Sequence, residues 1–186
     1  LFITDQQLAL LGATSQDFSM LASYAEILAE LAPTDVLTVT GHSLGGFLAQ
    51  AFATDFPYPI SHAYTYNGAG LGSFLSNPLG LLGISKSIPN DQITNLVGQG
   101  HTLVASTGTQ LGSKRNIFIE ETSLLANPIA NHLIEPLKDS LALYAVFVTI
   151  DPSLDRNISS ITEILNASSS VSAMSLENTL DALRRL

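Results

Sequence analysis

Residues 35–50 read DVLTVTGHSLGGFLAQ, and this stretch decides how the rest of the chain is interpreted. The β-branched, apolar residues before Gly41 are typical of a strand, and the apolar residues after Gly45 are typical of a helix. Between them lies the pattern G-x-S-x-G, with Ser43 at its centre. A strand, this pattern and a helix in succession predict a nucleophile elbow, a sharp turn that presents a reactive serine at the top of a sheet.

The spacing within the turn has a chemical reason. A serine between a strand and a helix adopts a strained backbone conformation, and Gly41 and Gly45 are expected to let the chain segments pass closely. The N–H of Leu44 and the start of the following helix are expected to lie where negative charge develops during acyl transfer, so Leu44 is the predicted oxyanion residue. Five residues alone would be a weak pattern, but the flanking strand and helix match the context that the chemistry requires.

Composition limits the classes of function. The 186 residues fit one domain with a sizeable core, and the absence of cysteine excludes disulfides and thiolate metal sites. Sixteen acidic and seven basic residues give a net charge of −9, which disfavours a nucleic-acid partner and a polybasic contact with membranes. Mean hydropathy is high at +0.31, yet no apolar stretch reaches the roughly 18 residues of a membrane span. We therefore expect an enzyme with an apolar site, and we predict no cofactor.

Strand patterns alternate with helical patterns, which predicts parallel βαβ units and an α/β fold. The expected strands are the one before Gly41 and residues 61–67, 92–97 and 116–119. The expected helices are residues 4–11, 16–31, 44–54, one that His132 opens, 159–166 and 175–186. We expect a core of residues 1–152 and a helical extension of residues 153–186. The abrupt start at Leu1, without methionine or a basic segment, shows no signal peptide and suggests excision from a longer polypeptide.

Helical periodicity also predicts which faces are buried. The predicted core face of helix 16–31 consists of Phe18, Leu21, Ala25 and Leu28, whereas Glu26 and Glu30 point elsewhere. The predicted apolar stripe of the helix at His132 consists of Leu133, Leu137, Leu141, Tyr144 and Val148, with Pro136 in its first turn. In strand 61–67, His62, Tyr64 and Tyr66 should share one face, and Ala63 and Thr65 the other.

Residues 68–83 mix five glycines with leucines and a phenylalanine. One interpretation is a buried loop with a short helix. The other interpretation is a lid, or one wall of an acyl-chain binding site, beside the serine. In it Leu71, Phe74 and Leu75 would contact an apolar substrate.

A serine nucleophile needs a base, and the chain has four histidines. His42 lies inside the motif and is interpreted as structural, and His62 as a satisfied core or surface residue. His101 lies in a glycine-rich loop and stays open as a second residue of the site. His132 follows the last expected strand and comes after the serine in chain order, as the base does in α/β hydrolases, so it is the predicted base.

These residues carry a family resemblance. Residues 39–46, VTGHSLGG, followed by Leu48-Ala49-Gln50, resemble the elbow of class 3 lipases within the α/β-hydrolase superfamily. Residues 131–134 and 139–144 resemble the histidine region of lipase-like domains in large bacterial secreted proteins. The resemblance covers about residues 5–152. It implies an α/β-hydrolase-like parallel sheet flanked by helices, hydrolysis of carboxylic esters of acyl lipids by a Ser-Asp-His triad, no metal in the chemistry, and a secreted or cell-surface location.

The sequence departs from this family in two ways. In this family the acid of the triad would follow strand 92–97, but residues 98–101 read GQGH and contain no acid. The candidates for the acid are therefore Asp91, Glu120 and Glu121. The alternative is a weakened enzyme that uses only the Ser-His pair. The family also has a strand and an oxyanion segment before the helix at Gln16. We expect the chain to be a partial, N-terminally truncated version that lacks the second oxyanion donor.

The leading hypothesis is a serine lipase or esterase, and the alternative is a weakened or inactive lipase-like module that binds a lipid or a protein. Esterase action on an acyl group attached to sugar or peptide is a third option. The predicted partners are an acyl ester or lipid substrate, with transient contact to a lipid surface, and the remainder of a larger polypeptide.

Overall fold

The structure is a computed structural model, and it describes residues 15–55, 60–70, 90–99, 108–120 and 131–169. Chain contacts divide the molecule into two compact units. The first comprises residues 1–96 and 104–115, and the second comprises residues 97–103 and 116–186.

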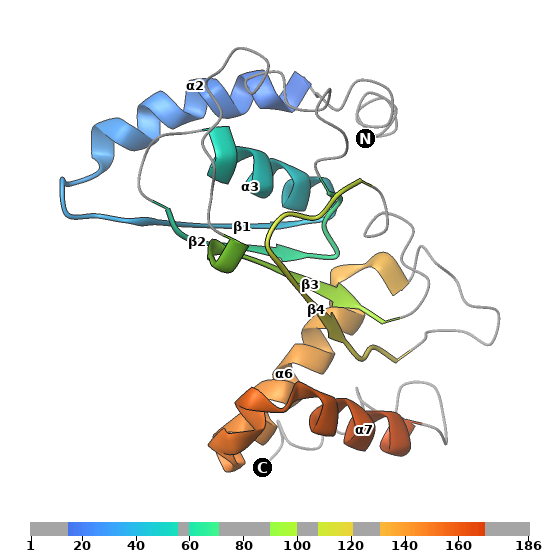
Figure 1. The fold of residues 1–186 in the computed structure, drawn as a ribbon. Coiled ribbons are helices and arrows are strands. Elements are labelled where there is room, and N and C mark those ends of the chain that lie inside the picture. The colour runs from blue at the N-terminus through green and yellow to red at the C-terminus, as the bar shows by residue number, and fades with distance from the viewer. Residues whose placement is uncertain (1–14, 56–59, 71–89, 100–107, 121–130, 170–186) are drawn as a thin grey trace. The chain divides into compact units, whose positions relative to one another are not determined.

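A four-stranded sheet in the order β1-β2-β3-β4 carries the fold (Figure 1). The strands are β1 (Leu37–His42), β2 (Ile60–Tyr66), β3 (Ile93–Gly98) and β4 (Ser113–Ile117). β1 pairs with β2, and β2 with β3, in parallel. Hydrogen bonds from Ser113 Oγ to the Ile93 carbonyl and from the Gln99 N–H to the Ile117 carbonyl join the starts and the ends of β3 and β4, so this pair is also parallel. The predicted α/β class with a parallel sheet is confirmed.

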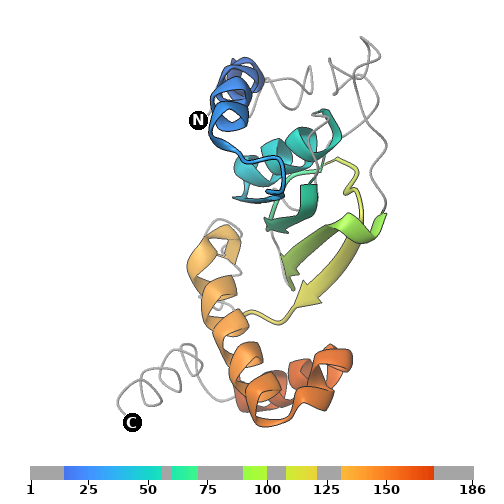
Figure 2. The same ribbon diagram turned by 90° about the vertical axis from the view of Figure 1, so that its left-hand side faces the viewer.

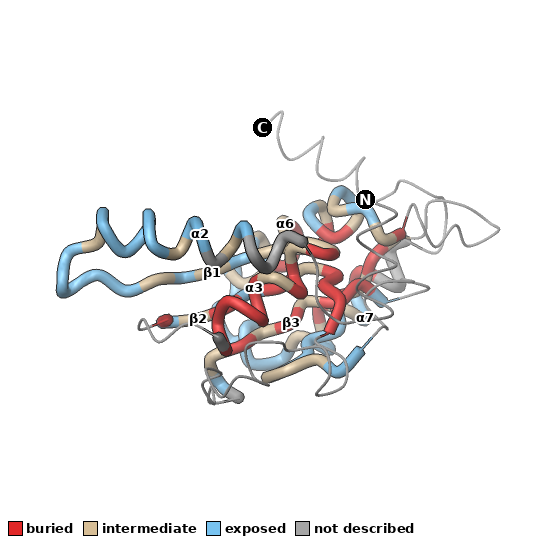
Figure 3. Tube along the Cα trace, turned by 90° about the horizontal axis from the view of Figure 1, so that it is seen from above, coloured by how far each residue is buried: buried red, intermediate tan, exposed pale blue. Residues whose placement is uncertain are grey.

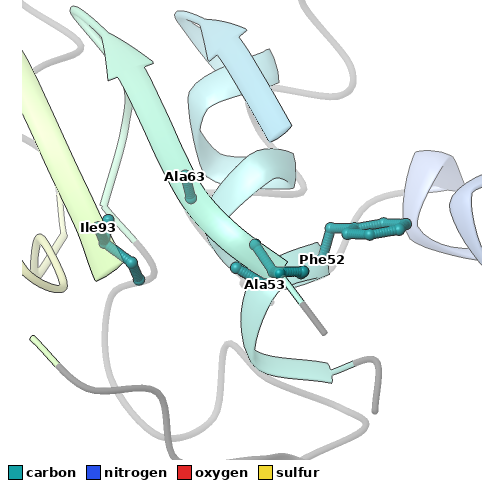
Figure 4. Close-up of a cluster of buried hydrophobic side chains, with 5 residues drawn as sticks. Phe52, Ala53, Ala63 and Ile93 are labelled. Atoms are coloured by element: carbon teal, nitrogen blue, oxygen red, sulfur yellow. The ribbon is translucent and has the colours of Figure 1, made fainter. Parts of the chain in front are cut away.

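In the first unit, helices α2 (Ser15–Glu30) and α3 (Leu44–Asp55) lie on the same side of the sheet (Figures 1 and 2). Most residues that α3 buries are small or apolar, with Gln50 and Thr54 as exceptions, so the helix packs closely against β1 and β2. Phe52 and Ala53 of α3 meet Ala63 of β2 and Ile93 of β3 in one buried cluster (Figure 4). The ring of Phe52 points toward α2, where Tyr24 contacts it edge-on at a centroid distance of 5.8 Å.

The predicted core face of α2 is wrong in the half of the helix whose side chains are described. Ala25 is exposed and Leu28 is 38% exposed, whereas Met20 and Tyr24 pack against the core. Much of α2 is coloured as exposed in Figure 3. Helical spacing finds an apolar stripe, but it does not say which neighbouring stripe another element covers. Glu26 and Glu30 are exposed as expected.

The second unit contains α6 (Ile134–Ile150), the short 3-10 helix η3 (Pro152–Arg156) and α7 (Ile158–Ser169). Tyr144 of α6 is buried, and its hydroxyl lies 2.5 Å from the Thr162 hydroxyl of α7. Leu137 and Tyr144 of the predicted stripe are buried, but Leu133 is 50% exposed because it caps the helix. The sequence did not predict η3.

Most element predictions in the described residues are confirmed within one or two residues. β4 exists but begins three residues earlier than predicted, and α7 extends further toward the C-terminus. The faces of β2 are as predicted, because Ala63 and Thr65 are fully buried and Tyr64 is 37% exposed. The helices expected at residues 4–11 and 175–186 lie outside the described residues. Within the described part, none of the helices has the length and apolar character needed to span a membrane.

Candidate active site

Ser43 occupies the turn between β1 and α3 in a left-handed conformation, with φ 57°. Non-glycine residues rarely adopt this conformation, which costs free energy unless the surroundings hold it. Both sides of the Ser43 backbone are held: its N–H donates to the Tyr66 carbonyl at 3.1 Å, and its carbonyl accepts from the N–H groups of Gly46 and Ala69 at 3.0 and 3.2 Å. The strain expected of a nucleophile elbow is therefore present at the predicted residue.

Only one of the two glycines of the motif lies where a side chain would not fit. A Cβ atom on Gly41 would lie 1.9 Å from the Gly45 carbonyl oxygen, so only glycine fits there. A Cβ atom on Gly45 would meet nothing within 4 Å, so the expectation that Gly45 serves close passage is wrong. The next residue does so instead, because a Cβ on Gly46 would lie 2.5 Å from the Gly68 Cα. Close approach of α3 to the segment after β2 therefore depends on the second glycine of the pair.

A second strained residue lies beside the first. Asn67, directly after β2, has φ 45° and is fully buried, and its N–H donates to the Leu96 carbonyl at 2.9 Å. Asparagine tolerates this conformation better than most residues. Ser43 and Asn67 thus lie at the carboxyl ends of neighbouring parallel strands, the edge where open α/β sheets bind ligands. Asn67 was not predicted as a residue of the site, although the dipeptide Asn67-Gly68 is a turn signal.

Gln50 of α3 is the main support of this region, and no structural role was predicted for it from the sequence. Its side chain is fully buried. Its amide nitrogen donates to the Ala69 carbonyl at 2.9 Å and to the Gly46 carbonyl at 3.3 Å, and its amide oxygen accepts from the Leu111 N–H at 3.0 Å. One side chain thereby joins the helix after Ser43 to the segments that follow β2 and precede β4. A polar residue on the sheet-facing side of an apolar helix was the available signal.

Replacing Gln50 by leucine should destabilise the fold by about 3 kcal/mol, because the buried Ala69 carbonyl and Leu111 N–H lose their partner. Chemical denaturation of the two proteins measures this difference. Gln99→Leu is the control, since Gln99 is exposed and its backbone N–H bond to Ile117 persists. Equal unfolding midpoints for the two variants would contradict the supporting role of Gln50.

Leu44 is the first residue of α3, and its side chain is buried. The N–H groups of a helix's first turn have no partner within the helix and carry the positive end of its dipole. Leu44 therefore has the position that an oxyanion donor needs, and its assignment stays a prediction.

The described histidines lie at different positions relative to Ser43 in the chain and the sheet. His42 ends β1 and is half-buried. His62 pairs in register with Thr38, four residues before His42, and its Nε2 lies 2.9 Å from the Thr94 hydroxyl while its ring stacks on Tyr64. These contacts agree with a satisfied residue remote from Ser43. His101 lies outside the described residues.

His132 lies two residues before α6 rather than opening it, and it is half-buried. It belongs to the second unit, as does Glu120, which follows β4 by three residues and is also half-buried. Asp91 lies in the short 3-10 helix η2 (Asn90–Gln92) before β3 and is exposed. Glu121 and the predicted substrate-loop residues Leu71, Phe74 and Leu75 lie outside the described residues.

Asp91 is at the far end of the sheet from Ser43. Leu96 pairs with Tyr66, which pairs with His42, so Leu96 marks the level of the elbow on β3. Three strand steps separate Ile93 from Leu96, roughly 10 Å at about 3.3 Å per residue, and Asp91 lies in η2 before that strand. This placement disfavours Asp91 as a residue of the Ser43 site.

Among the described residues, no three His, Asp or Glu side chains are grouped as metal ligands would be. No family model and no curated protein matches the chain. The site must therefore be interpreted from its own residues.

Proposed function

We propose that the protein is a serine carboxylic-ester hydrolase, a lipase or esterase that acts on acyl lipids. The observation that carries the proposal is the left-handed conformation of Ser43, φ 57°, between a parallel strand and the start of a helix. Such a turn presents the serine hydroxyl beside the first N–H groups of the helix, which is the arrangement that acyl transfer uses. Strain of this kind persists where the surroundings enforce it, and two hydrogen-bonded neighbouring segments do so here.

In the proposed reaction, Ser43 Oγ attacks the ester carbonyl carbon while His132 accepts the hydroxyl proton. The Leu44 N–H and the positive end of α3 stabilise the oxyanion. His132 then returns the proton to the leaving alcohol, which leaves an acyl group on Ser43. Water, deprotonated by the same histidine, releases the carboxylic acid and restores the serine.

For the acid that orients His132, we favour Glu120 over Asp91. Glu120 follows the carboxyl end of β4, and functional groups of parallel sheets gather at carboxyl ends. Asp91 precedes β3 and is therefore at the opposite end. Glu121, the neighbour of Glu120, is the remaining candidate.

The roles of His132 and Glu120 predict a pattern in mutant kinetics. His132→Gln should lower kcat on p-nitrophenyl esters about 10³-fold, and Glu120→Gln should lower it by at least about 10², because loss of a general base or its orienting acid has effects of this size. His62→Gln and Asp91→Asn are matched controls and should keep wild-type turnover. A loss in Asp91→Asn with none in Glu120→Gln would reverse the assignment of the acid.

Covalent labelling tests the proposal directly. A fluorophosphonate should modify the native chain, and peptide mass spectrometry should place the adduct on Ser43. A series of p-nitrophenyl esters from acetate to palmitate would then define the acyl preference, which we expect to favour medium or long chains. A folded protein that neither reacts with the probe nor hydrolyses any ester would contradict the proposal and favour a lipase-like binding module.

A further inference from the structure

The chain turns directly after β2, over residues 66–69. Asn67 is the first central residue of this turn and has φ 45°. A positive φ at that position is characteristic of primed β-turns, in which glycine, asparagine and aspartate predominate. The conformation of Asn67 therefore decides the direction in which the chain leaves β2.

Ser43 is hydrogen-bonded to both ends of this turn. In a closed β-turn the carbonyl of the first residue accepts from the N–H of the fourth. Here the Tyr66 carbonyl accepts from the Ser43 N–H at 3.1 Å, and the Ala69 N–H donates to the Ser43 carbonyl at 3.2 Å. Three residues of extended strand would separate Tyr66 from Ala69 by about 10 Å. Both can bond to one residue because the chain turns at Asn67.

Contacts with other segments of the first unit hold the turn in place. Each of its last three residues has a hydrogen-bond partner elsewhere. The partners are the Leu96 carbonyl for the Asn67 N–H at 2.9 Å, the Gln110 amide nitrogen for the Gly68 carbonyl at 2.7 Å, and the Gln50 amide nitrogen for the Ala69 carbonyl at 2.9 Å. The turn is thus a fixed support against which the left-handed conformation of Ser43 is held.

From this arrangement we infer that Asn67 is a positioning residue for Ser43. Its tolerance of a positive φ keeps the Tyr66 carbonyl and the Ala69 N–H directed at the Ser43 backbone. Those two bonds in turn hold the Ser43 hydroxyl at the start of α3. Asn67 is fully buried and acts through the turn rather than on the substrate. Its part in catalysis rests on the proposed ester hydrolysis, whereas its hold on the Ser43 backbone does not.

Two variants isolate the backbone conformation from the side chain. Asn67→Ala and Asn67→Gly both remove the amide group, and they differ only by a Cβ atom at φ 45°. Glycine adopts a positive φ freely, whereas alanine is disfavoured there. In hydrogen exchange, the Ser43 and Ala69 N–H groups should exchange about fivefold faster in Asn67→Ala than in Asn67→Gly. The amides of α6 are the internal reference and should exchange alike in both.

Kinetics give a second comparison of the same pair. Labelling of Ser43 by a fluorophosphonate should be about fivefold slower in Asn67→Ala than in Asn67→Gly. The kcat on p-nitrophenyl butyrate should fall by the same factor with KM unchanged, because the turn affects the geometry of the nucleophile rather than substrate binding.

Asn95→Ala is the control for a loss of stability alone. Asn95 is also fully buried, and its amide nitrogen donates to the Leu111 and Ser113 carbonyls. Its replacement should lower the unfolding midpoint, because buried acceptors lose their partner. The folded protein should nevertheless be labelled at the wild-type rate. Stability alone therefore cannot produce the difference expected between the two Asn67 variants.

Equal exchange and equal labelling in Asn67→Ala and Asn67→Gly would overturn the inference. If Asn67→Ala does not fold, Asn67→Gly decides: protection and labelling within about twofold of the wild type support the inference. A folded Asn67→Gly that is labelled about tenfold more slowly would assign the effect to the side chain and overturn it. A wild-type chain that never reacts with the probe would instead contradict the proposed function, and the exchange comparison would still decide whether Asn67 holds Ser43.

Discussion

Replacing Ser43 by alanine is expected to lower ester turnover by on the order of 10⁵, because the acyl group then has no nucleophile to accept it. The fold should survive, since the hydrogen bonds that join Ser43 to Tyr66, Gly46 and Ala69 use its backbone N–H and carbonyl, which alanine keeps. Alanine has a higher conformational free energy than glycine at φ 57°. The native serine already carries a Cβ atom at this position, so the substitution adds no new backbone strain. Steady-state kinetics on p-nitrophenyl butyrate, with circular dichroism as the check on folding, measures both expectations.

The control for this variant is Ser159→Ala, which removes an exposed hydroxyl on α7. It should retain full turnover and full labelling by the fluorophosphonate. Activity that persists in Ser43→Ala would show that the hydrolysis comes from another residue or from a contaminant, and the proposal would then fail. Activity lost equally in both variants would point to a general loss of structure rather than to chemistry at Ser43.

The sequence was sufficient for the fold around Ser43 because several signals agreed there. The run before Gly41 has strand character, the run after Gly45 has helix character, and the pattern between them fixes the turn. The helix after Ser43 begins at Leu44 as predicted and ends one residue later than predicted, and the strand before it extends to His42. The start of β4 was missed because SKRN is polar and exposed, so it lacks the apolar alternation that marks a half-buried strand.

The supports of the site were harder to predict than its centre. Gln50 and Asn67 act through hydrogen bonds to backbone groups of segments far away in the chain, and nothing in their local sequence specifies those partners. The face of α2 was mispredicted for a related reason, since Met20 and Tyr24 face the core only because Phe52 and its neighbours lie there. Local patterns predict elements, whereas contacts between distant elements decide which side chains matter.

The glycines of the motif give the sharpest test of this geometry. Gly41→Ala should destabilise the protein by about 4 kcal/mol or more, because its new Cβ would overlap backbone atoms of Gly45 and Gly46, which cannot rotate away. Gly45→Ala should instead be neutral or more stable by about 0.5 kcal/mol, since its Cβ meets open space and alanine favours the helix. The two variants make the same chemical change at positions four residues apart, and denaturant unfolding compares them directly.

Gly46→Ala adds a third point to this series. Its Cβ would approach the Gly68 Cα to 2.5 Å, so we expect a stability loss between those of the other two variants, since α3 as a rigid body can shift by a few tenths of an ångström. The expected order of stability is therefore Gly45→Ala, Gly46→Ala and Gly41→Ala, from most to least stable. A Gly45→Ala variant as unstable as Gly41→Ala would mean that the turn at Ser43 differs from the one described, and the assignment of Ser43 as a nucleophile would lose its main support.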